Sequence, residues 1–279
     1  MKNRIKSIIT LSVTCLTTLL LTGNSYANDN NEHNLLAYSV AWKQTAAEYR
    51  ALYYQGFNLA KMHLDKAITE QKKGDKPLAV VTDLDDTLVL PLEYWGKLIQ
   101  NNKDFFEDPL WDDWIPTNGM VPSPGSKEFL EYAKNNKVDI FYVTSRNQGE
   151  PTWELAKQNI LAMGFPLKDD AHLTVLTDTS NKETRQNEIL KDYNVVVFLG
   201  DNLNDFKRKY YVKGDVEGRI AKMKEDKDLF GSKYILFPNP TDGHWLAAIF
   251  GESEPKATPK NREILIEAAA KTAWKNEGQ

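Results

Sequence analysis

The chain has 279 residues, a formal net charge of −4 at pH 7, 41% hydrophobic residues and 27% charged residues. This length suits one good-sized domain, or a domain with a helical attachment. The negative charge argues against a general polyanion-binding surface, so no nucleic acid polymer is expected as a partner. Any phosphate-bearing ligand therefore needs a local positive site.

The first 27 residues predict a secretory signal peptide. Three basic residues precede an apolar run over residues 8–21, and Ser25 and Ala27 place small side chains where an A-x-A-like cleavage site needs them. The run is short for a membrane-spanning helix. We therefore expect cleavage after Ala27, no membrane span in the mature chain, and a secreted, cell-surface or periplasmic location.

Cys15 is the single cysteine, and it lies inside this apolar run. A lipid-modified cysteine closes a hydrophobic segment rather than interrupting it, so a lipoprotein anchored through Cys15 is the less favoured alternative. Removal of the leader leaves no cysteine, which excludes disulfides and thiol chemistry in the mature chain.

Residues 35–71 are expected to be helical because apolar and aromatic residues recur there at roughly helical spacing. We expect one break, near Gln55-Gly56. Core packing is the favoured interpretation of the aromatic-rich stretch over 41–60, and a ligand surface is the alternative. We assign residues 28–76 as N-terminal helices that pack with a smaller helical subdomain.

The first strand is expected over residues 78–82, an apolar and β-branched run typical of a strand buried on both faces. It leads directly into Asp83, Asp85 and Asp86. Three carboxylates at the end of a buried strand are electrostatically costly unless a cation or a proton offsets them. The alternative is a turn or a helix cap, since aspartate serves in both.

A core domain is expected over residues 77–250, with a cap insertion over about 89–136. The insertion is rich in aromatic residues and interrupted by prolines, so it is neither a simple linker nor one long helix. Its end, over 126–135, is expected to be a helix that leads back to the sheet. Residues 251–279 are assigned to a C-terminal helix, expected over 263–274.

Strands alternating with helices imply right-handed crossovers and a largely parallel sheet. A capping box of Ser180 and Glu183 would begin the helix that ends near Tyr193, with Lys182 in its first turn. The remaining strands are expected over residues 138–143, 173–176, 195–199 and 234–237.

Polar side chains follow four separate predicted strands, at the point where each strand ends. They are Asp83 with Asp85, Thr144, Lys182, and Asp201 with Asp205. In an open parallel sheet the carboxyl ends of the strands form one crevice, and ligands bind there. Each motif is weak by itself, but the four in this order predict a single active site.

With this arrangement the chain resembles the haloacid dehalogenase superfamily and, within it, the class C acid phosphatases (the DDDD motif, an exported acid phosphatase and 5′-nucleotidase family). The two aspartate pairs are Asp83 with Asp85 and Asp201 with Asp205. The likeness extends to residues 42–61, 101–114 and 237–240. It implies a three-layer, haloacid-dehalogenase-like (Rossmann-like) α/β fold, a parallel sheet with a smaller, mainly helical cap.

The residue types also indicate the chemistry. Phosphoryl transfer needs an in-line nucleophile, a proton donor for the leaving oxygen, and positive charge around the transferring oxygens. Asp83 is the candidate nucleophile and would form an aspartyl-phosphate. Asp85 would protonate the leaving alcohol and then activate the hydrolytic water. Thr144 and Lys182 would hold the phosphoryl oxygens.

A hard divalent cation with oxygen ligands would let these acids coexist, and Mg²⁺ suits such a site best. The resemblance implies the Asp83 carboxylate, the Asp85 backbone carbonyl and Asp201 as ligands. Asp205 would be a further ligand, or would orient one from behind. His244 lies near the presumed mouth, and its role is left open.

The resemblance implies phosphomonoester substrates, including nucleoside monophosphates whose base is clamped by aromatic side chains. Trp111 matches one side of that clamp, and core packing of the cap is its alternative role. Asp242 stands where the family usually has a tyrosine, which leaves the nucleotide preference open. Arg146 and Asn147 would contact either substrate or solvent.

We therefore predict an exported, Mg²⁺-dependent acid phosphatase that hydrolyses small phosphomonoesters through Asp83. Two alternatives stay open. One is a non-catalytic surface or secreted binding protein on the same fold, and the other is a phosphotransferase that uses an alcohol in place of water. The sequence leaves the oligomeric state open, a homodimer included.

Overall fold

The computed structural model describes residues 34–271. The predicted signal peptide and Cys15 lie outside the described residues. Within residues 34–271, no helix combines the length and the apolar character that crossing a membrane requires.

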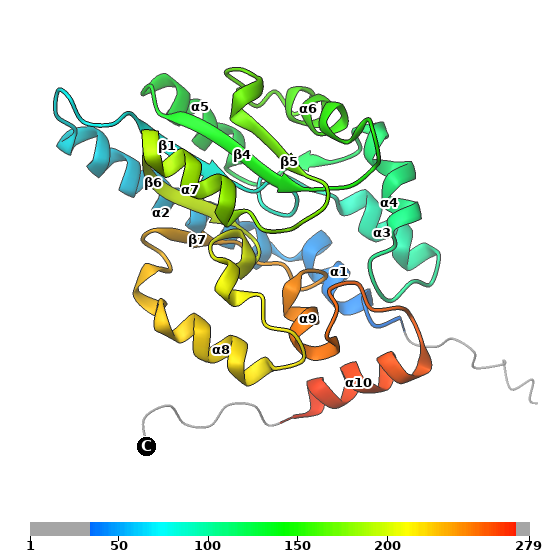
Figure 1. Ribbon diagram of the computed structural model, residues 1–279. Helices are drawn as coiled ribbons and strands as arrows, with labels where there is room; N and C mark the ends of the chain where they lie inside the picture. Colours follow the sequence, from blue (N-terminus) through cyan, green and yellow to red (C-terminus); the bar gives the residue numbers. More distant parts are fainter. Residues whose placement is uncertain (1–33, 272–279) are drawn as a thin grey trace, which may run out of the picture. The chain divides into compact units, whose positions relative to one another are not determined.

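A five-stranded sheet in the order β5-β4-β1-β6-β7 lies at the centre of the described chain (Figure 1). All of its neighbouring strands run parallel, as predicted. β1 is central and buried along its whole length. The strands are β1 (Leu78–Thr82), β4 (Asp139–Ser145), β5 (Leu173–Leu176), β6 (Asn194–Gly200) and β7 (Tyr234–Leu236).

Helices cover both faces of the sheet, which gives the three layers of the predicted α/β fold. α2 (Ala47–Glu70), α5 (Ser126–Asn135) and α6 (Thr152–Ala162) cover one face, and α7 (Glu183–Asp192) covers the other (Figure 1). Successive residues of a strand point to opposite faces. Val80 accordingly packs with the first group of helices, and Val81 packs beneath α7.

The N-terminal helices are α1 (Ala37–Thr45) and α2 (Ala47–Glu70). The predicted break near Gln55-Gly56 is wrong, because the chain turns at Ala46, whose backbone is extended (ψ 127°). α2 runs straight through Gly56. A Cβ at that position would lie 2.5 Å from a ring carbon of Phe237, so the glycine permits close packing and does not end the helix.

The predicted cap insertion over 89–136 is mainly helical, and a short strand at its start pairs antiparallel with another over residues 121–122. Its helix over 126–135 is present as expected, and it packs on the sheet beside α2. The remaining elements are β2 (Val89–Leu90), α3 (Leu92–Gln100), α4 (Asp108–Trp114) and β3 (Val121–Pro122). The side chains of Tyr94, Trp95 and Trp114 are fully buried here, so much of the aromatic content of the insertion is core.

The C-terminal part holds α8 (Val216–Glu225), α9 (His244–Phe250) and α10 (Pro259–Ala270). α10 begins before the predicted residue 263 because the Thr258 hydroxyl caps it, accepting a hydrogen bond from the backbone N–H of Asn261 at 3.1 Å. Short 3₁₀ turns lie at Ile115–Thr117, Asp170–His172, Leu203–Asp205, Arg208–Tyr210 and Lys227–Leu229.

The capping box predicted for Ser180 and Glu183 is wrong. α7 begins at Glu183, and no side chain caps it. The Glu183 carboxylate instead accepts a hydrogen bond from the backbone N–H of Arg208 at 2.9 Å and pairs with Lys207 at 3.2 Å. Glu183 therefore makes tertiary contacts in place of the helix cap that the local sequence pattern predicted.

Candidate active site

The side chains predicted for the active site meet at the carboxyl edge of the sheet. Asp83 directly follows β1, Thr144 lies at the end of β4, and Asp201 follows β6. Lys182 immediately precedes α7, in the connection from β5. A cavity of about 280 Å³ is lined by Asp83, Asp85, Thr144, Lys182, Asp201 and Asp205 together.

Three of the carboxylates lie close enough to share a cation. Oxygens of Asp83, Asp201 and Asp205 all lie within 4.8 Å of one another. The hydroxyl of Thr87 bridges two of them, with its Oγ1 3.3 Å from Asp83 Oδ2 and 3.2 Å from Asp201 Oδ1. A cluster of carboxylate oxygens fits a hard divalent cation and does not fit a soft one.

Lys182 provides the positive charge inside this cluster. Its buried ammonium donates one hydrogen bond to Asp83 Oδ1 and another to Asp205 Oδ1, the latter at 2.7 Å. Burial by itself would lower the pKa of Lys182, but Asp205 and Asp83 outweigh that effect and raise it. Lys182 is therefore held protonated, as a group that stabilises phosphoryl oxygens must be.

The carboxylates are costly to ionise without a cation. Burial raises the pKa of Asp83 to about 6, although Lys182 opposes the shift. Burial also raises the pKa of Asp201 well above its usual value, and the charges of Asp205 and Asp83 add to this. A bound cation would remove this repulsion, so the donor set and its electrostatics both fit a metal site.

Asp85 lines the same cavity but is paired with Arg146 and is not one of the three clustered carboxylates. Its two oxygens accept hydrogen bonds from Nε and Nη2 of Arg146, each at 2.7 Å. Arg146 in turn donates from Nη1 to Asn159 Oδ1 on α6 at 2.6 Å, which fixes the guanidinium. The sequence left open whether Arg146 contacts substrate or solvent. Its position directly after β4 was a signal that it reaches the same edge of the sheet.

Asp205 is held in place by its own loop. Asn202 and Asp205 form a reciprocal capping box around the turn Leu203–Asp205, with the Asn202 backbone N–H 2.8 Å from Asp205 Oδ2. Gln186 on α7 donates to the Asp205 backbone carbonyl at 2.5 Å. A side chain at Gly200 would collide with Asp205, so the glycine that ends β6 lets this carboxylate approach.

Asp86 lies next to the site in a left-handed backbone conformation, with φ at 52°. Its carboxylate pairs with Lys43 of α1 at 2.6 Å. Its backbone carbonyl accepts a hydrogen bond from the Tyr53 hydroxyl at 2.5 Å. The sequence did not identify Lys43 as a residue of the site, because the pattern of an amphipathic helix does not indicate which residue a lysine on it will pair with.

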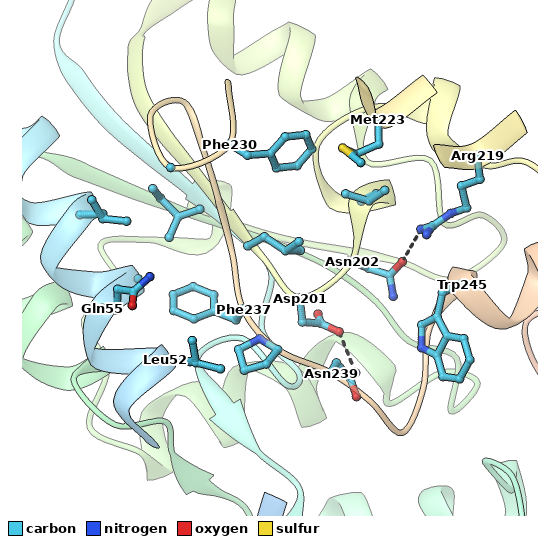
Figure 2. A pocket seen from close by; sticks show the side chains of 17 residues that line it. Leu52, Gln55, Asp201, Asn202, Arg219, Met223, Phe230, Phe237, Asn239 and Trp245 are labelled. Carbon is cyan, nitrogen blue, oxygen red and sulfur yellow. Dashed lines mark hydrogen bonds between the residues drawn. The ribbon is translucent and has the colours of Figure 1, made fainter. Parts of the chain in front are cut away.

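Asn239 joins the loop after β7 to the carboxylate cluster. Its amide nitrogen donates to Asp201 Oδ2 at 2.8 Å. Figure 2 shows this pair in a pocket of about 640 Å³, with Phe237, Leu52 and Trp245 among its walls. Asn239 belongs to the segment 237–240 that carried part of the family resemblance, but no role was assigned to its side chain.

A second cavity, of about 400 Å³, opens beside the carboxylate cluster and is lined by Asp85, Arg146, Trp111, Asp242 and Glu254 among others. Trp111 is only 6% exposed and packs edge-on against Tyr94, so it serves the core of the insertion and the cavity wall together. Burial and the charge of Glu254 raise the pKa of Asp242 to about 7.

His244 begins α9 and lines the cavity that holds the carboxylates. Burial, and then the positive charges of Arg219 and Lys182, lower its pKa to about 3. The imidazole is therefore neutral. Its role, left open in the sequence, is confined to hydrogen bonding or packing at ordinary pH.

The fold and the site together define a class of α/β protein with a carboxylate-rich, cation-competent centre at the strand ends. The family model "HAD superfamily, subfamily IIIB (Acid phosphatase)" matches residues 17–245, and the chain belongs to this family.

The chain is also similar to solved structures of a class C acid phosphatase from Bacillus anthracis, one with tungstate bound and one without. Each matches with a TM-score of 0.75 and 29% sequence identity, covering 85% of this chain and 97% of that one. A class B acid phosphatase from Edwardsiella ictaluri (strain 93-146) is 23% identical over 146 residues. That match spans 50% of this chain and 60% of the relative.

Proposed function

We propose that this protein is an exported, Mg²⁺-dependent acid phosphatase of the class C type, which hydrolyses phosphomonoesters through an aspartyl-phosphate on Asp83. The observation that carries the proposal is the position of Asp83. It lies at the tip of the central strand, bonded to Lys182 and within 4.8 Å of the oxygens of Asp201 and Asp205. A similar class C acid phosphatase structure holds tungstate, a tetrahedral oxyanion, which supports a phosphate-like ligand for this family.

Asp83, Asp201 and Asp205 would hold the cation, with the Asp85 backbone carbonyl as the further ligand that the family resemblance implies. When bound, Mg²⁺ supplies positive charge that neutralises the carboxylates and the transferring phosphoryl group. Lys182 and Thr144, which line the same cavity, would bind the phosphoryl oxygens.

In the first step an Asp83 oxygen attacks phosphorus, the bond to the leaving alcohol breaks, and Asp85 gives its proton to that oxygen. In the second step Asp85 takes a proton from water as the water oxygen attacks phosphorus. The bond to Asp83 then breaks, which frees phosphate and restores the carboxylate. In this structure Arg146 bonds both oxygens of Asp85, so the Asp85 side chain must leave this pair before it can act as the acid and base.

Colorimetric release of an aryl alcohol from an aryl phosphate, measured across pH, tests this mechanism. Asp83→Asn is expected to lose about 10³-fold or more of kcat, because the nucleophile is gone. A chelator is expected to abolish wild-type activity, and added Mg²⁺ to restore it. Asp113→Asn, at an exposed position on α4, is the matched control. Full activity of Asp83→Asn, or indifference to the chelator, would contradict the proposal.

The same assay separates hydrolysis from phosphotransfer. With a small alcohol added as acceptor, a hydrolase releases phosphate and aryl alcohol in equal amounts, whereas a phosphotransferase leaves part of the phosphate on the acceptor. We propose hydrolysis, and we keep nucleoside monophosphates as candidate substrates because Trp111 lines the cavity beside Asp85. Comparing nucleoside monophosphates with aryl and sugar phosphates tests that preference.

A further inference from the structure

We propose that Lys43 and Asn239 are positioning residues of this site. Lys43 fixes Asp86 and Asn239, and Asn239 holds the Asp201 carboxylate in the orientation that binds the cation. The inference rests on the proposed function, because it assigns Asp201 to the cation. It makes α1 a working part of the site, although Lys43 lies 40 residues before Asp83 in the sequence (83 − 43 = 40).

The ammonium of Lys43 is buried and has polar and aromatic partners. Its side chain is 0% exposed, and its Nζ lies 2.6 Å from Asp86 Oδ1 and 2.8 Å from Thr241 Oγ1. The same nitrogen lies 4.9 Å from the centre of the Trp95 ring. An apolar side chain could fill this space without the cost of desolvating an ammonium. The charge is therefore better explained by what it orients than by packing.

The amide of Asn239 has one orientation that satisfies its surroundings. Its Oδ1 faces four donors: the Thr241 hydroxyl at 2.8 Å, the backbone N–H groups of Thr241 at 3.1 Å and Asp242 at 3.3 Å, and Lys43 Nζ at 3.5 Å. Its Nδ2 faces two carboxylates, Asp201 Oδ2 at 2.8 Å and Asp86 Oδ2 at 3.4 Å. Donors on one side and acceptors on the other assign the amide without ambiguity.

Asp201 is consequently held at both oxygens. Asn239 occupies Oδ2, as Figure 2 shows, and the Thr87 hydroxyl lies 3.2 Å from Oδ1. Hydrogen bonds behind a metal ligand fix the direction of its lone pairs, and their removal typically costs 10–100-fold in metal affinity. Since Lys43 and Thr241 set the orientation of Asn239, the loss of Lys43 should reach Asp201 through this chain of contacts.

Lys43 also contacts the nucleophile turn. Asp86 is three residues after Asp83, and its backbone is left-handed, with φ at 52°, a conformation that most side chains avoid and that aspartate adopts in turns. The ion pair with Lys43 and the hydrogen bond from Tyr53 to the Asp86 carbonyl hold that turn from the side of the N-terminal helices. The same lysine therefore supports both the strand-tip turn and the Asn239 loop.

The test measures Mg²⁺ binding without relying on turnover. Metal-free protein is titrated with Mg²⁺, and the rise in melting temperature gives the midpoint; kcat and KM are measured beside it. Asn239→Leu, a change of similar shape that uncovers no buried charge on Asn239 itself, is expected to raise the Mg²⁺ midpoint about tenfold or more. We expect kcat at limiting Mg²⁺ to fall, with KM for the phosphomonoester little changed.

Lys43→Met removes the charge and keeps the stem, and we expect the same shift of the Mg²⁺ midpoint. Lys43→Arg should restore part of it. Lys61→Met is the matched control, because Lys61 makes a half-exposed ion pair with Asp65 on α2, outside the three cavities of the site.

The double variant Lys43→Met with Asp86→Asn separates positioning from charge balance. It leaves no unpaired charge at the Lys43–Asp86 pair, so thermal stability should recover, while the Mg²⁺ midpoint stays raised. Recovery of the midpoint together with stability would overturn the inference, as would a wild-type midpoint in Asn239→Leu. If the wild type shows neither a Mg²⁺-dependent rise in melting temperature nor phosphatase activity, the proposed function fails, and this inference fails with it.

Discussion

At the scale of single residues, carboxyl groups that line the second cavity repel one another. The pKa of Asp242 is raised by burial and by Glu254, and that of Glu254 by burial and by Asp108. Repulsion of this kind is common at binding sites, where local stability is lower than elsewhere in a protein. The pH dependence of thermal stability should therefore report on the ionisation of these carboxyl groups.

Asp242 should destabilise the folded protein increasingly as pH rises. Its pKa in the folded protein is about 7, against an ordinary value of 3.8, so the folded state binds the proton more tightly than the unfolded state does. The contribution of protonated Asp242 to the free energy of unfolding is therefore fully present below about pH 4 and is lost as the pH rises toward 7. We expect Asp242→Asn to match the wild type in melting temperature at pH 4 and to exceed it at pH 8.

Thermal unfolding of metal-free protein between pH 4 and pH 8 measures this difference. Asp113→Asn, on the exposed side of α4, is the control and should show no such trend. A melting-temperature difference that stays constant across the range would contradict the assignment of the pKa shift to Asp242.

At the scale of elements, two local patterns gave wrong predictions for the same reason. Gly56 was expected to break the first long helix, but there a glycine is what the ring of Phe237 requires. Glu183 was expected to cap α7, but its carboxylate bonds the backbone of Arg208. In both cases a neighbour distant in sequence decided the outcome, and helix signals carry no information about that neighbour.

Gly56→Ala should destabilise the protein by about 1–3 kcal/mol through overpacking. The new Cβ would lie 2.5 Å from a ring carbon of Phe237, which is itself buried and stacked on Tyr53 and so has no room to move. This cost outweighs the gain of about 1 kcal/mol that alanine has over glycine inside a helix.

Gly96→Ala in α3 is the matched control. Its nearest neighbour to a new Cβ is Gln44 Nε2 at 3.9 Å, so the change should be neutral or stabilising by up to about 1 kcal/mol. Urea unfolding of both variants measures the two free energies of unfolding. Equal stability of Gly56→Ala and Gly96→Ala would show that Phe237 does not control this position.

At the scale of the whole molecule, export is a proposal that needs an experiment, because the predicted signal peptide lies outside the described residues. We propose that the mature chain begins at Asn28, because three basic residues, an apolar run and small residues at the cleavage site precede it. N-terminal sequencing of protein recovered outside the cell should read from Asn28. A lipid-modified terminus at Cys15 would support the alternative anchor instead.

The division into domains is likewise a proposal. We propose that the N-terminal helices, assigned to residues 28–76, pack with a smaller helical subdomain formed by the insertion over 89–136. The shared hydrophobic cluster supports it, since residues of α2, α3 and α5 pack together there with Val80 of β1. The pair of Lys43 with Asp86 crosses the same boundary, so the subdomain reaches the site by charge as well as by packing.

The sequence by itself determined the parallel sheet, its strands and the six side chains that line the cavity at their ends. This was possible because strand burial and strand-end polarity are local patterns, and because parallel strands bring their carboxyl ends to one edge. Only the tertiary structure decided that Arg146 bonds Asp85, that Lys43 pairs with Asp86, and that Asn239 donates a hydrogen bond to Asp201. Those partners are chosen by which helices and loops pack against the edge. Arg146 and Asn239 follow strands, which places them near the edge but does not identify their partners, and Lys43 on α1 carries no such signal.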